Sequence, residues 1–483
     1  MSRQLLFQLL ALPAKAAVNA YTWSTLPFYT LYQKPFSKLR LAKNFGVIST
    51  VDPKTGRRVY SRPTPPDIDH PYLKYQVFND IIPTLDRNRE VLGIRDVISE
   101  VPAVDEQTGE PVIIDGKPLV KVQLADDFRY LKVGEVLDRV EAIAKGLKEN
   151  LGVKPGDHVM IYADNSAEWF YSCLALLQIN AVMVTLFSTL NDSGVVFGIN
   201  HSDAKFVITS KRLLPKINRL SGQFEKVKSI VYIDENGKND DGNVEQLKAK
   251  GLEVVSLEQL AENGSKLPKM DFPSPNPDDT MLIMYTSGTT GNPKGVIISY
   301  RNFSAELHSL LRMDLENDKI CFSSVFAGYL PQAHLFGLVM NLGLFISDSK
   351  IAFCSPFTLL DSSPAHIPGQ VGDLRLIAPE FLVAVPLMLE RIIKEIYRKL
   401  NERSSISAPV FTYLMDYKIR WTARGFDTPI INRLVCKKIN DQFGGRLRLI
   451  GVSSAPLNEK TQALAQAAMG VKVVQAYGST EMA

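Results

Sequence analysis

Apolar and polar positions between residues 131 and 210 alternate in blocks that match helices and short buried strands. Residues 132–150 carry apolar side chains three and four positions apart, which predicts an amphipathic helix that ends at Gly152. Residues 154–163 place a turn before a short apolar run, which is typical of a buried strand. Further helices are expected at 166–179 and 191–202, and further strands at 181–187 and 204–210. Strands separated by helices of this length predict a parallel, doubly wound sheet.

A second run of the same kind begins near residue 280. The expected helices are 301–313, 336–346 and 386–400, and the expected strands are 281–287, 319–325, 349–355 and 446–454. Residues 262–279, rich in Pro, Asp and Ser, are interpreted as a linker, and residues 104–119 predict a hairpin insertion. We therefore expect an α/β fold of two stacked, mainly parallel sheets flanked by helices. Its first subdomain would be 46–265 and its second 276–483.

The first 45 residues have a different pattern. Residues 5–32 are mostly apolar, and the basic residues Lys34, Lys38, Arg40 and Lys43 follow them. On a helical wheel of about 100° per residue, the polar residues of this segment share a sector of about 60°. They are Gln4, Gln8, Lys15, Asn19 and Thr22. Pro13 is expected to kink or divide the helix.

We interpret residues 1–45 as an N-terminal membrane anchor with a basic flank. Residues 5–32 would contact membrane lipid, either by spanning the bilayer or by lying in its interface. The basic flank favours the cytosol for the rest of the chain. A cleaved signal peptide, with its small-residue site at 14–16, and a buried helix of the globular body are the alternatives.

Composition and charge limit the possible partners and metal sites of the chain. The chain has 483 residues, which is too long for one hydrophobic core, and its net charge of +4 comes from 55 basic and 51 acidic residues. So balanced a charge does not indicate a nucleic-acid partner. The cysteines are far apart without CxxC spacing, which favours a reducing compartment over a disulfide scaffold or a zinc site. Because the histidines also lack ligand spacing, a metal site would have to use oxygen ligands.

The segment "MYTSGTTGNPKGV" at 284–296 gathers hydroxyls, glycines and one lysine directly after a predicted strand. Open α/β sheets bind ligands at the carboxyl ends of strands, and such donors suit a phosphate chain. A Walker P-loop requires GK followed by Ser or Thr, but Lys294 is followed by Gly295. The chain also lacks the HRD and DFG triplets of protein kinases. The loop therefore predicts a phosphate site of another kind.

With three further segments, this loop resembles the signatures of the acyl-adenylate-forming superfamily, which includes acyl-CoA synthetases, luciferases and peptide-synthetase adenylation domains. "YLPQAHLFG" at 329–337 resembles the segment beside the acyl carboxylate, and "GGRLRLIGVSSAPL" at 444–457 resembles a wall of the adenine pocket. "VQAYGSTE" at 474–481 resembles the "YGxTE" signature. The segment 376–392 and the N-terminal anchor are most similar to long-chain fatty acid–CoA ligases. The resemblance covers residues from about 70 to the end.

The resemblance implies a set of site residues. Lys294, which adds charge near the phosphates, His334, which contacts the acyl carboxylate or gates its tunnel, and Glu481 are the candidate catalytic residues. The candidate nucleotide-binding residues are Thr286, Ser287, Gly288, Thr289, Thr290, Gly291, Lys294, Ser454, Ala455, Pro456, Gln475, Ala476, Tyr477, Gly478, Ser479 and Thr480. The candidate metal ligands are Thr286 and Glu481. For His334 and Tyr477 a packing role in the core is the alternative, and for Glu481 a solvated loop acid.

The resemblance also implies a reaction. A long-chain fatty acid, ATP and coenzyme A would give acyl-CoA, AMP and diphosphate through an acyl-adenylate, with Mg²⁺ as cofactor and neutralisation of phosphate charge as the main requirement. We expect the endoplasmic reticulum membrane ahead of the mitochondrial outer membrane, the peroxisome or a lipid droplet. A homodimer is left open. The alternatives are a truncated pseudo-enzyme or membrane-tethered acyl-binding partner, and a ligase for another carboxylic acid.

Two departures from the superfamily pattern affect these expectations. Ser453 and Ser454 stand where the family has glycine or another small residue, and their side chains are expected to crowd the adenine. The sequence ends at Ala483, before the family's ribose-binding Asp, its hinge and its small C-terminal domain. We therefore expect a chain that is incomplete and weakly active or inactive alone.

Overall fold

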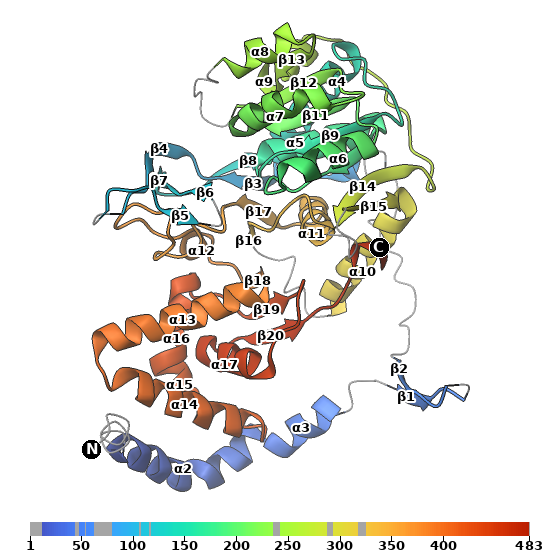
Figure 1. Ribbon diagram of the computed structural model, residues 1–483. Coiled ribbons are helices and arrows are strands. Elements are labelled where there is room, and N and C mark those ends of the chain that lie inside the picture. The colour runs from blue at the N-terminus through green and yellow to red at the C-terminus, as the bar shows by residue number, and fades with distance from the viewer. Residues whose placement is uncertain are drawn as a thin grey trace. The chain divides into compact units, whose positions relative to one another are not determined.

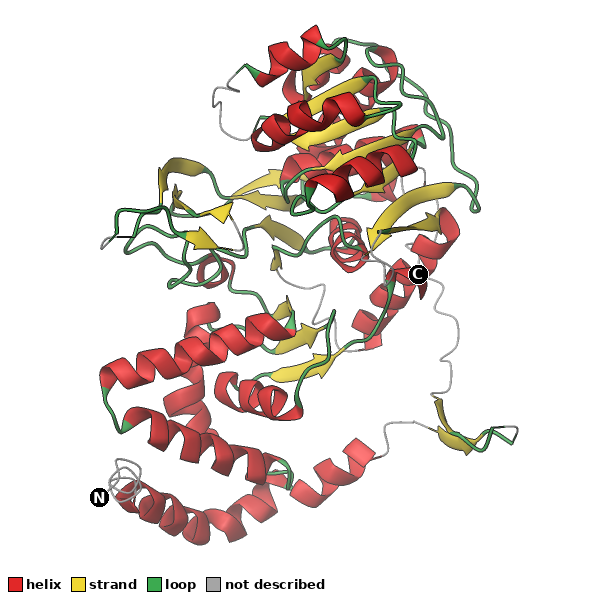
Figure 2. Cartoon of the chain, in the orientation of Figure 1, coloured by secondary structure: helices red, strands yellow, loops and turns green. Residues whose placement is uncertain are grey.

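The computed structural model is shown in Figures 1 and 2. It describes residues 12–43, 48–53, 55–61, 80–105, 108–114, 117–234, 242–286, 293–316 and 325–482. The chain forms two compact units. One contains the described residues of Met1–Asp69 together with Phe381–Tyr477, and the other those of His70–Glu380 together with Gly478–Ala483.

The unit that contains His70–Glu380 is built around a seven-stranded sheet. Its strands, in spatial order, are β13 (Glu253–Ser256), β12 (Ser229–Ile233), β11 (Phe206–Ser210), β9 (His158–Tyr162), β10 (Val182–Thr185), β14 (Thr280–Thr286) and β15 (Lys294–Ser299). The first six strands run parallel and β15 runs antiparallel to β14. The expected α/β class and the mainly parallel sheet are confirmed.

Helices cover both faces of this sheet (Figure 1). One face packs on α6 (Asp192–His201), α7 (Leu214–Leu220) and α8 (Asn243–Ala249). The other packs on α5 (Ala167–Ile179) and α9 (Leu257–Ser265), and α4 (Val133–Glu149) packs on both of these helices. Because both faces are covered, strands such as β10 are buried at every position, as a parallel sheet requires. The Asn191 side chain accepts a hydrogen bond from Gly194 N and caps α6.

A four-stranded sheet lies in the same unit. Its order is β16 (Val325–Gly328), β17 (Lys350–Phe353), β3 (Glu90–Ile94) and β8 (Arg129–Lys132), with β8 antiparallel and the other pairs parallel. The Phe170 ring of α5 contacts Phe353 of β17 and Phe345 of α11 (Leu335–Ile346). Helix α5 therefore packs between β10 and β17, so the two sheets are stacked with a helical layer between them.

The remaining elements of this unit extend from the two sheets. The hairpin insertion expected at 104–119 is present: β4 (Val97–Pro102) pairs antiparallel with β7 (Val120–Leu124), and β5 (Ile113–Ile114) with β6 (Lys117–Pro118). The unit also contains the helices α10 (Tyr300–Glu316) and α12 (Asp373–Ile377) and the short η3 (Ile82–Thr84). The strand expected at 319–325 lies almost wholly outside the described residues.

The other unit has a parallel sheet of β18 (Phe381–Ala384), β19 (Leu449–Val452) and β20 (Lys472–Gln475). Its helices are α13 (Pro386–Arg403), α14 (Ser407–Thr422), α15 (Pro429–Ile431), α16 (Lys437–Asn440), α17 (Glu459–Met469), α2 (Leu12–Gln33) and α3 (Pro35–Lys43). A hairpin of β1 (Ile48–Val51) and β2 (Arg58–Ser61) follows α3. The core of this unit joins α14, α17 and residues 431–436.

The structure divides the chain differently from the two expected subdomains. Residues 262–279 lead from α9 to β14, and β14 pairs with β10, so one sheet contains strands from both 46–265 and 276–483. Apolar periodicity identified the strands but not their neighbours, because strand pairing over this sequence distance is decided by packing.

The N-terminal segment also differs from the expectation. Within the described part of the chain, which begins at Leu12, none of the helices is long and apolar enough to cross a membrane. The part of the expected anchor helix that precedes Leu12 lies outside the described residues. Pro13 is the second described residue of α2, so the kink expected there stays a prediction. The described helix ends at Gln33, and Lys34, whose φ is +46°, separates it from α3, which begins at Pro35.

Candidate functional site

Thr286 and Lys294 frame the glycine-rich loop from the ends of two adjacent strands. Thr286 is the last residue of β14 and Lys294 the first of β15, and they are paired directly across this antiparallel ladder. Thr286 is half-buried and Lys294 is exposed. Strands β14 and β15 therefore form an antiparallel pair, whereas a Walker loop leads from a strand into a helix. Ser287, Gly288, Thr289, Thr290 and Gly291 lie outside the described residues.

Two residues that the sequence analysis missed fix the base of this hairpin. The buried Tyr285 places its hydroxyl 2.8 Å from Nδ1 of His201 in α6. The His201 ring in turn stacks on Phe197, with ring centroids 4.9 Å apart. Burial raises the pKa of Tyr285 to about 12, so its hydroxyl stays protonated at neutral pH. In the sequence, Tyr285 directly before Thr286 could have indicated a residue that supports the loop. Its partner His201 could not be identified, because it comes from a distant helix.

Gly295, the second residue of β15, packs closely against two side chains of β14. A Cβ at Gly295 would lie 3.0 Å from Cγ2 of Ile283 and 3.3 Å from Cζ of Tyr285. These are tighter than ordinary van der Waals contacts, so a larger residue would force the neighbouring side chains of β14 to move. The glycine after Lys294, which distinguishes this loop from a Walker loop, therefore has a packing reason.

His334 lies at the N-terminus of α11 in a tightly held loop. The Asn165 side chain donates to the Tyr329 carbonyl at 3.3 Å and accepts from Gln332 N at 2.8 Å. The Gln332 side chain accepts from Ser166 N at 3.1 Å. These bonds tie the loop to the turn before α5. Sequence analysis missed both amides, because polar residues between apolar ones are also typical of loop surfaces.

The geometry of His334 determines which of its ring nitrogens carries the proton. Its Nδ1 accepts a hydrogen bond from Phe336 N at 3.2 Å. Burial lowers the pKa of His334, because desolvation disfavours the imidazolium. A neutral ring that accepts through Nδ1 carries its proton on Nε2. His334 can therefore donate one hydrogen bond to an acceptor such as a carboxylate.

In the other unit, the candidate adenine-binding residues gather at one sheet edge. Ser454, Ala455 and Pro456 follow β19, and Gln475, Ala476 and Tyr477 lie at and after the end of β20. The two strands are parallel, Val452 is paired with Gln475, and Ala476 N donates to the Val452 carbonyl at 2.8 Å. Both segments therefore lie at the carboxyl edge of one sheet. The Tyr477 side chain is 92% exposed, so its ring face is available to a ligand and is not part of the core.

The backbone at Ser454 has a conformation that favours glycine. Its φ is +76°, in the left-handed region, and the side chain is exposed. The superfamily pattern has glycine or alanine here. The departure at Ser454 therefore places a side chain on a strained turn, which adds a backbone cost to the expected crowding of the adenine.

The last motif is shared between the two units. Gly478, Ser479, Thr480 and Glu481 belong to the unit that contains Thr286 and Lys294, whereas Tyr477 belongs to the other. Thr480 is 7% exposed and Glu481 is exposed within the short helix η8 (Thr480–Met482). The two candidate metal ligands, Thr286 and Glu481, are thus part of one unit.

The donor chemistry of these two residues fits magnesium. Mg²⁺ is held in nucleotide sites by one or two protein oxygens, with water and substrate phosphates as its other ligands. A hydroxyl and a carboxylate are sufficient for that role. The described residues contain no group of three or more His, Cys, Asp or Glu side chains placed to hold a metal by themselves.

Comparison with known proteins agrees with the motif analysis. A model of the AMP-binding enzyme family matches residues 104–483. The chain is 29% identical over 373 residues to long chain acyl-CoA synthetase 8 of Arabidopsis thaliana, a match that covers 76% of this chain and 51% of that protein. It is 27% identical over 359 residues to fatty acyl-CoA synthetase B of Dictyostelium discoideum, covering 73% of this chain and 51% of that protein. The chain spans about half the length of these relatives.

Solved structures show the same fold. The adenylation domain of a carboxylate reductase from Mycobacterium chelonae has a TM-score of 0.62 at 20% identity, covering 85% of this chain and 61% of that one. The A domain of carboxylic acid reductase from Segniliparus rugosus, in complex with AMP and a co-purified carboxylic acid, has a TM-score of 0.60 at 19% identity, covering 81% and 58%. At such identities the likeness concerns the fold alone.

Proposed function

Because the chain belongs to the AMP-binding enzyme family, we propose that the complete protein is a long-chain fatty acid–CoA ligase. In the first step a fatty acid carboxylate attacks the α-phosphorus of ATP, forming acyl-AMP and releasing diphosphate. In the second step the thiol of coenzyme A attacks the acyl carbon, forming acyl-CoA and releasing AMP. The proposal is supported by the family match and by relatives named long chain acyl-CoA synthetase and fatty acyl-CoA synthetase.

The residues of the β14–β15 hairpin support the first step. Thr286 and Lys294 are cross-strand partners where the loop leaves and rejoins the sheet, so the loop has a hydroxyl residue at one end and an ammonium residue at the other. The approach of two anions requires such fixed positive and hydrogen-bonding groups, since these stabilise the developing charge without reorganisation. Mg²⁺, held by Glu481 and Thr286, supplies further neutralisation of phosphate charge when bound.

His334 and the carboxyl edge of the β18–β19–β20 sheet are proposed to orient the two substrates. The neutral His334 ring, with its proton on Nε2, donates to the acyl carboxylate while its Nδ1 stays bonded to Phe336 N. Ser454, Ala455 and Pro456 line one side of the adenine, and the exposed ring of Tyr477 stacks on its face. Gln475 and Ala476 hold this segment in register with β19.

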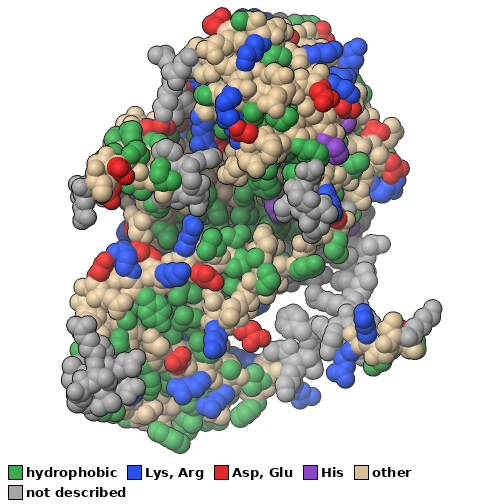
Figure 3. All heavy atoms as spheres, in the orientation of Figure 1, with side chains coloured by type: hydrophobic (Ala, Val, Ile, Leu, Met, Phe, Trp, Pro, Cys, Tyr) green, Lys and Arg blue, Asp and Glu red, His purple; other side chains and the backbone are tan. Residues whose placement is uncertain are grey.

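We further propose that the N-terminal segment binds membrane lipid from the cytosolic side, with α2 and α3 in the interface. The endoplasmic reticulum is the proposed membrane. Trp23, Phe28, Leu31 and Tyr32 of α2 are each more than 60% exposed. Exposed Lys34, Lys38 and Arg40 follow them, and Figure 3 shows hydrophobic and basic side chains together over α2 and α3. Aromatic rings beside lysine and arginine favour an anionic interface.

The catalytic proposal is tested by ATP–diphosphate exchange. The full-length protein is incubated with ATP, Mg²⁺, labelled diphosphate and one acid from a panel of fatty, aryl and amino acids. Exchange that depends on long-chain fatty acids supports the proposal, and Glu481→Ala should lower it by about 10²-fold, the loss expected for one fixed electrostatic group. Exchange with another class of acid would identify a different ligase, and no exchange with any acid would favour a pseudo-enzyme.

The membrane proposal has a separate test. Trp23, Phe28 and Leu31 are replaced together by Ser, which leaves the side of α2 that packs on α14 intact. The triple variant should leave the membrane fraction while the parent stays in it. If both sediment equally with vesicles that contain anionic lipid, α2 is not the contact.

A further inference from the structure

A lysine and a cysteine are in contact in the core of the unit that contains Phe381–Tyr477. Lys418 of α14 is 8% exposed and Cys436 is 3% exposed. The Lys418 Nζ donates to the Cys436 Sγ at 3.1 Å, and that thiol donates to the Ala467 carbonyl of α17 at 3.1 Å. Among the described residues, no carboxylate forms an ion pair with Lys418. A buried lysine is normally paired with an acid, so a thiol as its partner is unusual.

The segment that carries this cysteine departs from regular helical geometry. Asn432–Cys436 form the π-helix η6, which lies between α15 and α16. π-Helical turns are rare and are frequent at functional sites. Cys436 is the last residue of this turn and packs in the core beside Phe411 and Met415. An uncommon backbone turn therefore brings the thiol against the lysine of α14.

Gly470 leaves room beside both side chains. It follows α17 with a φ of +68°, in the left-handed region. A Cβ at Gly470 would lie 3.2 Å from the Cys436 Cβ, 3.7 Å from the Lys418 Nζ and 4.0 Å from the Cys436 Sγ. Because glycine lacks this atom, the space beside the sulfur and the amine can accept one added oxygen atom.

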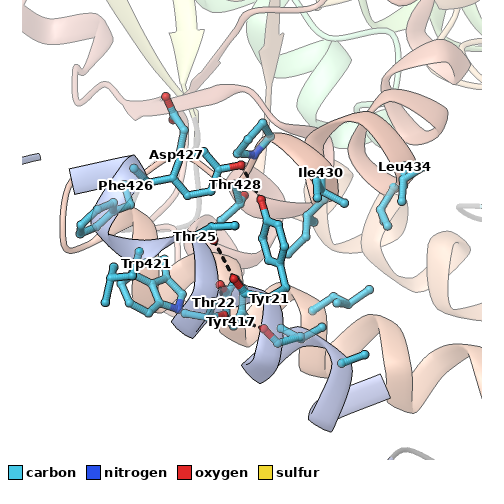
Figure 4. Close-up of a pocket in the computed structure, with 18 residues that line it drawn as sticks. Tyr21, Thr22, Thr25, Tyr417, Trp421, Phe426, Asp427, Thr428, Ile430 and Leu434 are labelled. Carbon is cyan, nitrogen blue, oxygen red and sulfur yellow. Dashed lines mark hydrogen bonds between the residues drawn. The ribbon is translucent and has the colours of Figure 1, made fainter. Parts of the chain in front are cut away.

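A cavity lies one residue away from the pair on each of its two elements. Tyr417 and Val435 line this cavity of about 360 Å³ between α2 and α14 (Figure 4). These two residues directly precede the lysine and the cysteine in the chain. Hydrogen peroxide is uncharged and similar in size to water, so it can enter the cavity and reach the thiol during local opening. A charged and much larger thiol such as glutathione is kept out by the same packing.

We propose that Lys418 and Cys436 form a covalent nitrogen–sulfur crosslink when the protein meets hydrogen peroxide. In the first step the sulfur attacks one peroxide oxygen, water leaves, and the thiol becomes a sulfenic acid. In the second step the neutral lysine amine attacks the sulfur, and the leaving hydroxide takes a proton from the nitrogen. One thiol, one amine and one peroxide thus give one sulfenamide and two waters. The sulfur is oxidised by two electrons and the peroxide is reduced.

Burial determines which nucleophile meets the sulfenic acid. At an exposed cysteine, a small thiol would attack and form a mixed disulfide. At Cys436 the Lys418 amine is already in contact, whereas external thiols are excluded. The crosslink would join α14 to η6 and remove the S–H donor that bonds to Ala467. Neither side chain belongs to the residues assigned to acid activation, so this modification does not rest on the proposed ligase activity.

Mass spectrometry of the oxidised protein tests the crosslink. The full-length protein is treated with hydrogen peroxide, alkylated in denaturant and digested. We expect a linked peptide pair that contains Lys418 and Cys436, with the mass of the two free peptides less two hydrogens. Because a thiol cleaves the N–S bond, dithiothreitol added after unfolding should release both peptides unmodified.

Matched variants and an internal control identify the nucleophile. Lys418→Arg keeps a cation but replaces the amine by a poorer nucleophile, so the linked pair should be lost. Lys394→Arg makes the same change at an exposed position of α13 and should leave the linked pair unchanged. Cys173 is also fully buried, and among the described residues no amine is hydrogen-bonded to it. It should therefore form no link to lysine in the same digest. Circular dichroism checks that each variant is folded.

Each outcome decides for or against the crosslink. A linked pair in the parent and in Lys394→Arg, but not in Lys418→Arg, supports it. A Cys436 that stays a thiol, or that ends as a sulfinic acid beside an unmodified Lys418, overturns it. A linked pair that retains one oxygen atom overturns the condensation step. Because the parent protein is analysed directly and no ligase activity is measured, the result depends neither on the folding of a variant nor on the proposed function.

Discussion

At the level of single residues, the candidate site is defined by the backbone conformation and the hydrogen bonds of a few side chains. Ser454 has a left-handed backbone at the carboxyl end of β19, where the superfamily pattern has glycine or another small residue. Thr286 and Lys294 are placed by strand register, and His334 by a backbone hydrogen bond to its Nδ1. Motif resemblance could identify these residues, but their conformations depend on neighbours that no motif contains.

Replacing Ser454 by Gly should stabilise the protein. A non-glycine residue in this region costs about 1–2 kcal/mol, and glycine adds an entropic cost of about 0.5–1 kcal/mol. We expect a net gain of about 0.5–1 kcal/mol in the free energy of unfolding, measured by urea denaturation. Ser453→Gly is the matched control, since Ser453 has no positive φ, and it should not be stabilising. Equal effects of the two changes would contradict the role of φ.

His334 should make stability depend on pH. Its folded-state pKa is lowered by burial, so the unfolded chain binds the proton more readily. The stability that the neutral ring contributes is present above the unfolded pKa of about 6.5 and is lost as the pH falls below it. His334→Asn keeps a residue that can cap α11 and removes the titration. Between pH 7.5 and 5.5, urea denaturation should show a smaller loss of stability for this variant than for the parent. An identical loss would show that another group is responsible.

At the level of elements, apolar periodicity predicted where helices and strands occur better than it predicted how they pack together. The predicted helix at 132–150 corresponds to α4, and the one at 386–400 to α13. Strand β15 was missed because its residues 294–299 follow the glycine-rich loop and pair antiparallel with β14, a partner that the parallel pattern did not suggest. The close packing of α4 on α9 was also not predicted. It depends on Gly146 of α4 and Gly264 of α9, and a glycine has no apolar side chain that periodicity could detect.

The crossing of α4 and α9 should depend on Gly264. A Cβ at this position in α9 would lie 1.9 Å from the carbonyl oxygen of Ala142 in α4. Because that atom belongs to a helix backbone, Gly264→Ala should force the helices apart and cost about 1–3 kcal/mol in the free energy of unfolding. Gly222→Ala is the control, because its Cβ would meet nothing within 4 Å and its φ is not positive. It should change stability by no more than about 0.5 kcal/mol. Similar losses at both positions would argue against the crossing.

At the level of the whole molecule, the sequence predicted the fold class and the order of motifs but not the division into units. The seven-stranded sheet takes strands from both expected subdomains, and the unit boundary falls between Tyr477 and Gly478, inside one motif. Such long-range pairing depends on which apolar faces fit together, and local patterns carry little of that information. A buried ion pair between distant segments is a second feature of this scale.

Arg95 and Asp373 form this pair. They are 278 residues apart, their charged atoms lie 2.7 Å from each other, and their side chains are 3% and 2% exposed. Arg95 also donates to the carbonyls of Ala125 and Val371, and Thr358 bonds to Asp373. The pair therefore joins the segment after β3 to the N-terminus of α12, with every charged group engaged by several partners.

Breaking this pair should destabilise the protein strongly. Arg95→Met removes the cation and leaves a buried carboxylate, which typically costs about 3–5 kcal/mol, and Asp373→Asn leaves a buried guanidinium. The double variant Arg95→Met, Asp373→Leu leaves no unpaired charge, so its loss should be smaller than the sum of the losses of Arg95→Met and Asp373→Leu. Urea denaturation of the parent, the single variants and the double variant measures this coupling. Losses that add without coupling would show that the two charges stabilise the fold independently, and that backbone carbonyls alone satisfy Arg95.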